Sequence, residues 1–219
     1  MCGRYYVDED AAREVLEIVR DLDHSRKEQL PSGDIHPSER AAVICGGPGG
    51  LTAELMRWGF PRSGSLPGAA ARESRGTALQ EKKGKPVAGG SLLINARSET
   101  VREKPTFRES VLHSRCIIPA ASFYEWDASG QKARLRRPGA AALFMAGIFR
   151  RYSEEERFVI LTTAASGTAA RVHDRMPLLL EPEELMLWTE PDGSWEQLLH
   201  ARERELLCER DYEQLSLPL

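Results

Sequence analysis

Apolar residues near the start of the chain recur with helical spacing. Between positions 8 and 22 they form one stripe at a period of about 3.6 residues. The stripe consists of Ala11, Val15, Leu16, Val19 and Leu22. Asp8 is suited to cap the first turn, where further acidic side chains follow. The pattern predicts an amphipathic helix over 8–22.

Further along, the apolar residues gather in short β-rich runs. AAVIC (41–45) and ELMRWGF (54–60) flank the glycine-rich turn GGPGG, so we expect two strands around that turn. RCIIPA (115–120), ALFMAGIF (142–149) and RFVILTT (157–163) predict more strands, the last two separated by the polar RRYSEEE. The basic run ARLRRPG (133–139) is interpreted as a turn between strands.

Helical patterns interrupt these runs irregularly. Thr106 and Glu109 form a capping-box pattern that predicts a short helix. EPEELMLW (181–188) and SWEQLLHARER (194–204) also read as helices, the second with a Ser194/Gln197 capping box. Strands and helices do not alternate strictly, so an α+β fold is favoured over a doubly wound parallel sheet.

The segment 63–90 differs in composition from the rest of the chain. It is rich in Gly, Ala, Ser and charged residues, and it has almost no large apolar side chain. Such a segment cannot bury much surface, so we expect a flexible surface insertion. The 219 residues suffice for one sizeable core, and the prediction is a single domain over 1–219.

Composition narrows the class of protein further. The chain is 41% hydrophobic and 29% charged, which is ordinary globular usage. It shows neither a membrane-length apolar run nor the pattern of a signal peptide. The four cysteines are scattered without CxxC pairing, which argues against a disulfide framework or a metal site and fits a reducing cytoplasm. The net charge of −3 means that any nucleic-acid surface must be local.

Cys2 directly follows the initiator methionine. Removal of Met1 would expose an α-amine and a thiol on adjacent carbons, an arrangement that only an N-terminal cysteine offers. An α-amine with a pKa of about 7.7–8.0 is partly unprotonated at neutral pH and can attack an aldehyde. The thiol can then close on the resulting imine to give a thiazolidine. Alternatively, Cys2 is an incidental small residue at a frayed terminus.

Four segments carry more polar and aromatic residues than a core requires. LLINARSET places Asn95, Arg97 and Glu99 after an apolar run, and FYEW sets Glu125 between two aromatic residues. VHDRMP contains His173, and ELMRWGF contains Trp58. Each has a structural alternative: a turn-forming Asn, a surface Glu beside half-buried rings, or a structural His. No single segment is therefore enough to assign a function.

Together, these segments resemble one family. MCGR, RWG, NARSET, KPTFR, RCIIPA followed by FYEW, and HDRMP occur in the order found in the SRAP family, from Met1 to about Glu184. The family consists of SOS-response-associated proteins that crosslink covalently to abasic sites in single-stranded DNA. The resemblance implies a compact α+β domain with a barrel-like, strand-rich core, flanking helices and a positively charged DNA groove.

The resemblance also implies roles for individual residues. Cys2 matches the nucleophile that is exposed when the protein removes Met1, and Asn95 matches the asparagine beside it. Glu125 matches the glutamate of proton transfer and Met1 removal, and His173 the histidine that promotes opening of the sugar ring. The expected DNA contacts are Arg4, Arg97 and Arg175 to phosphates, Trp58 against bases, and Pro37 from DIHPSE (34–39), where Asp34 and His36 depart from the usual pattern.

The implied activity is a thiazolidine crosslink that shields an abasic site from strand cleavage. It needs no cofactor or metal, and the expected protein is a cytoplasmic monomer, nucleoid-associated when bound to DNA. Imidazole suits ring opening near neutral pH, and a carboxyl group flanked by aromatic residues can have a raised pKa and transfer protons. Two alternatives remain: an N-terminal-nucleophile amidohydrolase or peptidase acting on another substrate, and a non-catalytic DNA-binding module.

Overall fold

Five strands close into a barrel at the centre of the computed structural model, which describes residues 2–19, 31–62, 92–152, 155–191, 193–200 and 202–210. The order around the barrel is β12–β4–β3–β8–β11 and back to β12, and only the β12–β4 pairing is parallel. The bounds are β3 (Arg40–Gly47), β4 (Gly50–Trp58), β8 (Arg115–Ala120), β11 (Leu143–Tyr152) and β12 (Glu155–Ala164).

Strand β12 extends beyond the barrel, and two short strands pair with its second half. β7 (Asn95–Arg97) pairs in parallel with residues 160–162, and β13 (Arg175–Pro177) pairs antiparallel with residues 162–164. β14 (Leu179–Leu180) pairs with β11. Two segments about 80 positions apart in the sequence therefore meet along the end of one strand.

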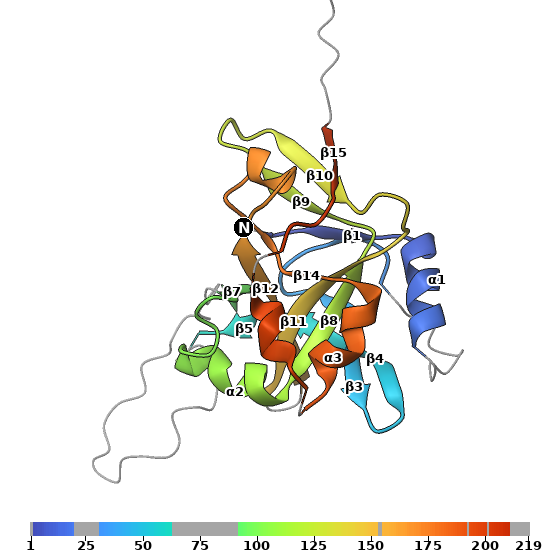
Figure 1. Cartoon of the computed structure of the whole chain (residues 1–219), viewed down its shortest axis with the longest axis vertical. Helices are drawn as coiled ribbons and strands as arrows, with labels where there is room; N and C mark the ends of the chain where they lie inside the picture. Colours follow the sequence, from blue (N-terminus) through green and yellow to red (C-terminus); the bar gives the residue numbers. More distant parts are fainter. Residues whose placement is uncertain are drawn as a thin grey trace, which may run out of the picture.

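A second sheet of five strands lies above the barrel in Figure 1. Its order is β15–β10–β9–β1–β2, with β1 (Tyr5–Val7), β2 (Gly33–Ile35), β9 (Ser122–Trp126), β10 (Lys132–Arg136) and β15 (Leu207–Arg210). Strand β1 lies between β9 and β2, which fixes the N-terminal segment on both sides. A small separate sheet joins β5 (Phe60–Pro61) and β6 (Leu92–Leu93).

Alternate residues of the barrel strands belong to two different hydrophobic clusters. One cluster, with Ile117, Phe144 and Val159, also contains residues of the helices α1 (Glu9–Ile18), α2 (Pro105–His113) and α3 (Leu185–Thr189). The other cluster faces the opposite way and contains Cys2 and Trp58. The chain start therefore packs into the core, whereas α2 packs on β8 and β11 and α3 packs on β3 and β8.

The structure confirms most of the elements expected from the sequence. The hairpin of β3 and β4 turns at Gly47 and Gly50, and RCIIPA, ALFMAGIF and RFVILTT are the central strands β8, β11 and β12. The N-terminal helix begins with the Asp8 cap, whose Oδ1 accepts from the Ala11 N–H at 2.9 Å. It ends at Ile18 with Val19 as its C-cap, and Leu22 lies outside the described residues.

Three local expectations are wrong. Helix α2 begins at Pro105 after Lys104 and has no side-chain cap bond, so the Thr106/Glu109 capping box does not form. Among the described residues of the run 194–204, the helical part is the 3₁₀ helix η4 (Trp195–Leu199), which has no side-chain cap; residues 202–206 have no regular structure and lead into β15. Residues 132–136 form strand β10 because the alternating Ala133 and Leu135 are buried.

Two further expectations concern a segment and a property of the whole chain. The segment 63–90 lies outside the described residues, so its role as an insertion stays a prediction. Over the residues that the structure describes, no helix is long and apolar enough to cross a membrane. The remaining short helices are η2 (Ala169–Arg171) and η3 (Pro182–Glu184).

Candidate active site

Cys2 is enclosed at the start of the strand that anchors the N-terminus. Its side chain has no exposed surface, and its Sγ lies 3.6 Å from the Arg4 carbonyl oxygen. The Asn95 side-chain amide donates a hydrogen bond of 2.8 Å to the Cys2 carbonyl oxygen. Burial, and then the nearby Glu125 carboxylate, raise the pKa of the Cys2 thiol. At neutral pH the sulfur therefore carries its proton and needs an acceptor for it during any reaction.

Glu125 reaches the same region from strand β9. Successive side chains of a strand point to opposite faces, so Phe123 and Glu125 point inward while Tyr124 and Trp126 face the other way. Glu125 is 2% exposed. Burial raises the pKa of its carboxyl group, and the amino terminus and His173 oppose that shift. A carboxyl group with a raised pKa can both deliver and accept a proton near neutral pH.

Asn95 connects β7 to the N-terminal segment. It pairs with Ile160 in the parallel β7–β12 ladder, which directs its side chain to Cys2. Its Oδ1 is buried and has no hydrogen-bond partner among the described residues. A buried acceptor left unpaired is unfavourable by about 1–3 kcal/mol. The amide thus holds Cys2 with its nitrogen, while its oxygen keeps its capacity to accept a hydrogen bond.

His173 stands between η2 and β13, with its side chain 28% exposed. Its Nδ1 accepts the Arg175 backbone N–H at 2.9 Å and also lies 2.7 Å from Asp174 Oδ1. The first contact requires a bare Nδ1 and the second an Nδ1–H group, so the ring makes one of the two contacts at a time. Both partners lie within two residues of His173 and hold its ring beside the start of β13.

The three arginines expected to bind phosphates differ in their surroundings. Arg175 is 12% exposed and donates to both Glu99 oxygens, at 2.6 and 2.9 Å, and to the Thr162 carbonyl oxygen at 2.6 Å. The hydrogen bond from Arg175 lowers the pKa of Glu99. Arg97 is exposed on β7. Arg4 lies 3.5 Å from Asp34 and is 32% exposed. Of the three, Arg97 is the most exposed to solvent.

Trp58 is a core residue, contrary to its expected role against bases. Its ring has no exposed surface, and its indole N–H donates to the Ile94 carbonyl oxygen at 2.9 Å. It lies between Tyr5 and Phe158, with ring centroids at 5.3 and 6.2 Å. This position is incompatible with base stacking. The cause is strand alternation, which turns Met56 and Trp58 to the same buried side of β4.

Pro37 occupies a tight turn beside the end of β4. The His36 N–H donates to the Glu39 side chain at 2.7 Å, and Ser38 has a positive φ of 74°. The Ser38 N–H donates to the Trp58 carbonyl oxygen at 2.9 Å. The turn is therefore fixed on the barrel, and Pro37 is half-buried. Its contact with DNA remains a prediction.

A group of aromatic and basic side chains on the outer face of the second sheet escaped the sequence interpretation. The Arg4 guanidinium lies 5.9 Å from the Tyr124 ring centroid and 5.5 Å from that of Trp126. Lys132 and Arg134 approach the rings of Tyr124 and Tyr6 at 5.3 and 5.1 Å. The alternation of KARLR against SFYEW carries this signal, but it becomes visible only when 132–136 is assigned as a strand.

The predicted catalytic residues thus come together from four parts of the chain. Cys2 and Asn95 share a hydrogen bond, and the carboxyl group of Glu125 is coupled electrostatically to both Cys2 and His173. Over the described part of the chain, no group of three or more His, Cys, Asp or Glu side chains could hold a metal ion. The arrangement brings together a buried thiol, an amide, a buried carboxyl group and an imidazole.

Comparison with known proteins identifies the family. Residues 1–215 match the SOS response associated peptidase (SRAP) family. The chain belongs to this family. Among its relatives are the abasic site processing proteins YoaM and YoqW of Bacillus subtilis. YoaM is 30% identical over 205 residues, 89% of this chain and 81% of that protein, and YoqW is 28% identical over 203 residues, 89% and 82%.

Solved structures show the same SRAP-like fold. A protein from Bacteroides thetaiotaomicron aligns with a TM-score of 0.74 at 22% identity, covering 97% of this chain and 93% of that one. A phage-related protein from Bordetella bronchiseptica aligns with a TM-score of 0.67 at 23% identity, covering 95% and 93%. The expected strand-rich α+β domain with a barrel-like core is confirmed.

Proposed function

We propose that this SRAP protein binds single-stranded DNA at abasic sites and forms a covalent crosslink through Cys2 after removing its own Met1. Relatives in the family are named abasic site processing proteins. The observation that carries the proposal is the convergence on Cys2 of Asn95 and of a buried carboxyl group with a raised pKa, that of Glu125.

The first bond forms between the Cys2 α-amine and the aldehyde carbon of the opened sugar. His173 assists ring opening by giving a proton to the ring oxygen as the bond from C1 to that oxygen breaks, while the proton of the C1 hydroxyl passes to water and the aldehyde forms. Attack by the amine gives a carbinolamine. Glu125 in its protonated form delivers a proton to the departing hydroxyl, so that water leaves and an imine remains.

The thiol then completes the adduct. Sγ adds to the imine carbon, and the thiol proton moves to the nitrogen, which becomes a secondary amine in a five-membered ring. The overall balance is aldehyde plus aminothiol giving thiazolidine plus water. Because the pKa of the buried thiol is raised, a nearby base must assist this proton transfer, and ionised Glu125 is suited to that role. Ring closure removes the imine from which β-elimination would cleave the strand.

The DNA backbone is assigned to the arginines around this centre. Arg97 and Arg4 contact phosphates by charge-assisted hydrogen bonds, with Pro37 at the edge of the footprint. Arg175 contributes when Glu99 yields one of its hydrogen bonds to a phosphate oxygen. Trp126, which is half-buried, replaces Trp58 as the aromatic residue near the strand, because its ring lies beside the Arg4 guanidinium at 5.5 Å.

Incubation with a single-stranded oligonucleotide that carries one abasic site tests the proposal. We expect a protein–DNA band that survives denaturation without any reductant, and an intact protein mass that lacks Met1. An oligonucleotide whose abasic aldehyde was first reduced with borohydride should give no band. An equally strong band on the reduced sugar would refute the aldehyde chemistry, and absence of a band on both would favour an N-terminal-nucleophile hydrolase.

A further inference from the structure

Glu99 forms a two-pronged ion pair next to the candidate site. It lies in the turn that follows β7, and its two carboxylate oxygens accept from the Arg175 guanidinium at 2.6 and 2.9 Å. Two parallel hydrogen bonds of this kind fix the orientation of both groups as well as their distance. The pair therefore joins the end of β7 to the start of β13.

The two strands that this pair joins are short and lie on opposite edges of β12. β7 and β13 have three residues each, and both pair with Thr162. The Thr162 carbonyl oxygen accepts from the Ser98 N–H at 2.8 Å on one side and from the Arg175 guanidinium at 2.6 Å on the other. Strands of this length form few ladder hydrogen bonds, so side-chain contacts contribute much of what holds them in place.

Strands β7 and β13 present polar residues of the candidate site on one face. Asn95, Arg97 and Arg175 pair with every second residue of β12, at positions 160, 162 and 164. Because alternate residues of a strand point to the same side, these three side chains lie on one face of the sheet. The relative position of β7 and β13 therefore sets the relative position of the groups around Cys2.

The imidazole of His173 depends on the same joint. The Arg175 backbone N–H donates to His173 Nδ1 at 2.9 Å. Arg175 is thus held by Glu99 through its side chain, and it holds His173 through its backbone. A shift at the start of β13 would move the imidazole relative to a sugar bound at Cys2.

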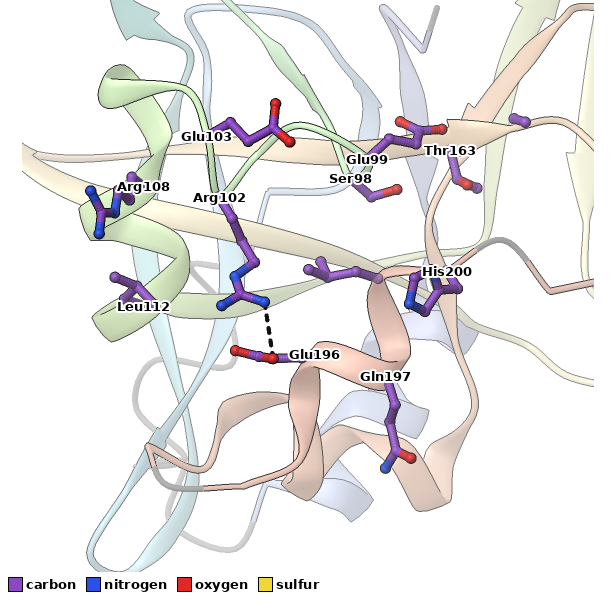
Figure 2. Close-up of a pocket in the computed structure, with 12 residues that line it drawn as sticks. Ser98, Glu99, Arg102, Glu103, Arg108, Leu112, Thr163, Glu196, Gln197 and His200 are labelled. Atoms are coloured by element: carbon purple, nitrogen blue, oxygen red, sulfur yellow. Dashed lines mark ion pairs between the residues drawn. The ribbon is translucent and has the colours of Figure 1, made fainter.

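A second ion pair near Glu99 leads elsewhere in the molecule. Glu99 lines a cavity of about 1020 Å³ (Figure 2). Across this cavity Arg102, from the same turn as Glu99, reaches Glu196 of η4 at 2.9 Å, as Figure 2 shows. The Glu196 side chain is 50% exposed, close to the 45% of Glu99. The two carboxylates are therefore alike in exposure and in having an arginine partner, but Glu99 is joined to β13 and Glu196 belongs to η4.

We propose that Glu99 is a positioning residue for the reaction, because it holds Arg175 and thereby fixes the start of β13 and the His173 ring beside the sugar. This inference rests on the proposed function, since it takes His173 to assist the opening of an abasic sugar. It goes beyond that function by assigning part of the rate to a residue outside the group around Cys2.

Glu99→Ala tests the inference, with Glu196→Ala as the matched control. Single-turnover adduct formation at saturating single-stranded abasic DNA should slow by about 10–100-fold in Glu99→Ala, because small displacements of reacting groups are costly. Glu196→Ala should react at the wild-type rate. Glu99→Gln, which keeps the shape of the side chain but not its charge, should show a smaller slowing of the same kind.

Noncovalent affinity separates positioning from a general loss of structure. It is measured by fluorescence anisotropy on an oligonucleotide with a tetrahydrofuran abasic analogue, which has no aldehyde. In Glu99→Ala this affinity should be unchanged or tighter, because Arg175 then has donors free for a phosphate. A damaged fold would instead weaken binding together with the rate.

Two further comparisons test whether Glu99 acts through His173. Residues that act as a unit have non-additive effects, so Glu99→Ala should slow the reaction by less than about twofold in a His173→Ala background. With an oligonucleotide whose aldehyde is acyclic and cannot close to a hemiacetal, Glu99→Ala should react at the wild-type rate, because no ring has to open.

A wild-type rate of Glu99→Ala on the cyclic abasic sugar would overturn the inference. Equal slowing by Glu99→Ala with and without His173 would also overturn it, as would a loss of affinity as large as the loss of rate. Failure of the proposed function is a different outcome, in which the wild type itself forms no adduct with abasic DNA.

Discussion

Two buried polar clusters in this molecule are built in opposite ways. Arg115, 5% exposed, donates hydrogen bonds of 2.5–2.7 Å to the carbonyl oxygens of Val111, Leu112, Trp188 and Glu190. Its guanidinium also lies 4.3 Å from the Trp195 ring centroid. At the candidate site, by contrast, the buried Oδ1 of Asn95 has no partner among the described residues.

The difference separates a structural cluster from a functional one. Burial lowers the pKa of Arg115 to about 10, so this side chain stays charged at neutral pH while it joins α2, α3 and η4. In the cluster around Cys2, by contrast, the Asn95 oxygen keeps unused hydrogen-bonding capacity, and burial raises the pKa of Glu125. Groups that weaken the fold are the ones that the proposed reaction uses, which is the usual compromise between stability and activity.

The largest expected effect is on the rate at the Cys2 cluster. Glu125→Gln cannot transfer a proton, so single-turnover adduct formation at saturating abasic DNA should slow by about 10²–10⁴-fold. Affinity for DNA with a tetrahydrofuran site should change little. Glu54→Gln, an exposed change on β4, is the control and should react at the wild-type rate. If Glu125→Gln reacted at the wild-type rate, Glu125 would not transfer a proton in the rate-limiting step.

Arg115→Met should have the largest effect on stability. The change leaves four buried carbonyl oxygens without their donor, so we expect a loss of about 3 kcal/mol or more in the free energy of unfolding, measured in urea. The control is Arg151→Met, because the Arg151 side chain is 75% exposed on β11. It should change stability by no more than about 0.5 kcal/mol. If the two substitutions changed stability equally, the Arg115 cluster would have no special role in stabilising the fold.

Glu125→Gln should stabilise the fold while it abolishes fast reaction. Because the folded-state pKa of Glu125 is raised, the unfolded chain ionises first as pH rises. The wild type therefore loses stability between the ordinary glutamate pKa of 4.5 and the higher pKa of the folded state. The variant should lack that decline and gain about 0.5–2 kcal/mol at neutral pH. Urea titrations from pH 4 to 8 measure both curves. A less stable variant at neutral pH would contradict the raised pKa.

The smallest effect concerns the exposed Arg97. Losing one phosphate contact should weaken binding of single-stranded DNA, and the slope of log affinity against log salt should fall by about 0.7. Excess protein or lower salt should restore the adduct. Lys104→Ala serves as the comparison, since this residue is exposed at the start of α2. If the salt dependence of binding were unchanged in Arg97→Ala, the DNA phosphates would not contact Arg97.

Much of the fold could be predicted because, in the barrel strands, the spacing of the apolar residues and their β-propensity both indicate strands. RCIIPA and RFVILTT are short, mostly buried apolar runs, a pattern typical of buried strands. The residues after Leu199 misled the interpretation because their helical pattern yields to pairing of β15 with β10, a tertiary contact that local sequence does not contain. The convergence of Cys2, Asn95, Glu125 and His173 was expected only through the family resemblance, since their strands meet through long-range pairing. Trp58 shows a limit of the family resemblance. Its place in the RWG motif does not reveal which side of β4 its side chain faces.

The most direct test of the central claim compares the wild type with Cys2→Ser on the same abasic oligonucleotide. The serine variant keeps an α-amine once Met1 is removed, but it cannot close a thiazolidine. The account predicts that the wild-type adduct withstands denaturation without reductant, whereas the Cys2→Ser adduct is recovered only when borohydride traps the imine. A Cys2→Ser adduct as durable as that of the wild type without reduction would contradict the role assigned to the thiol.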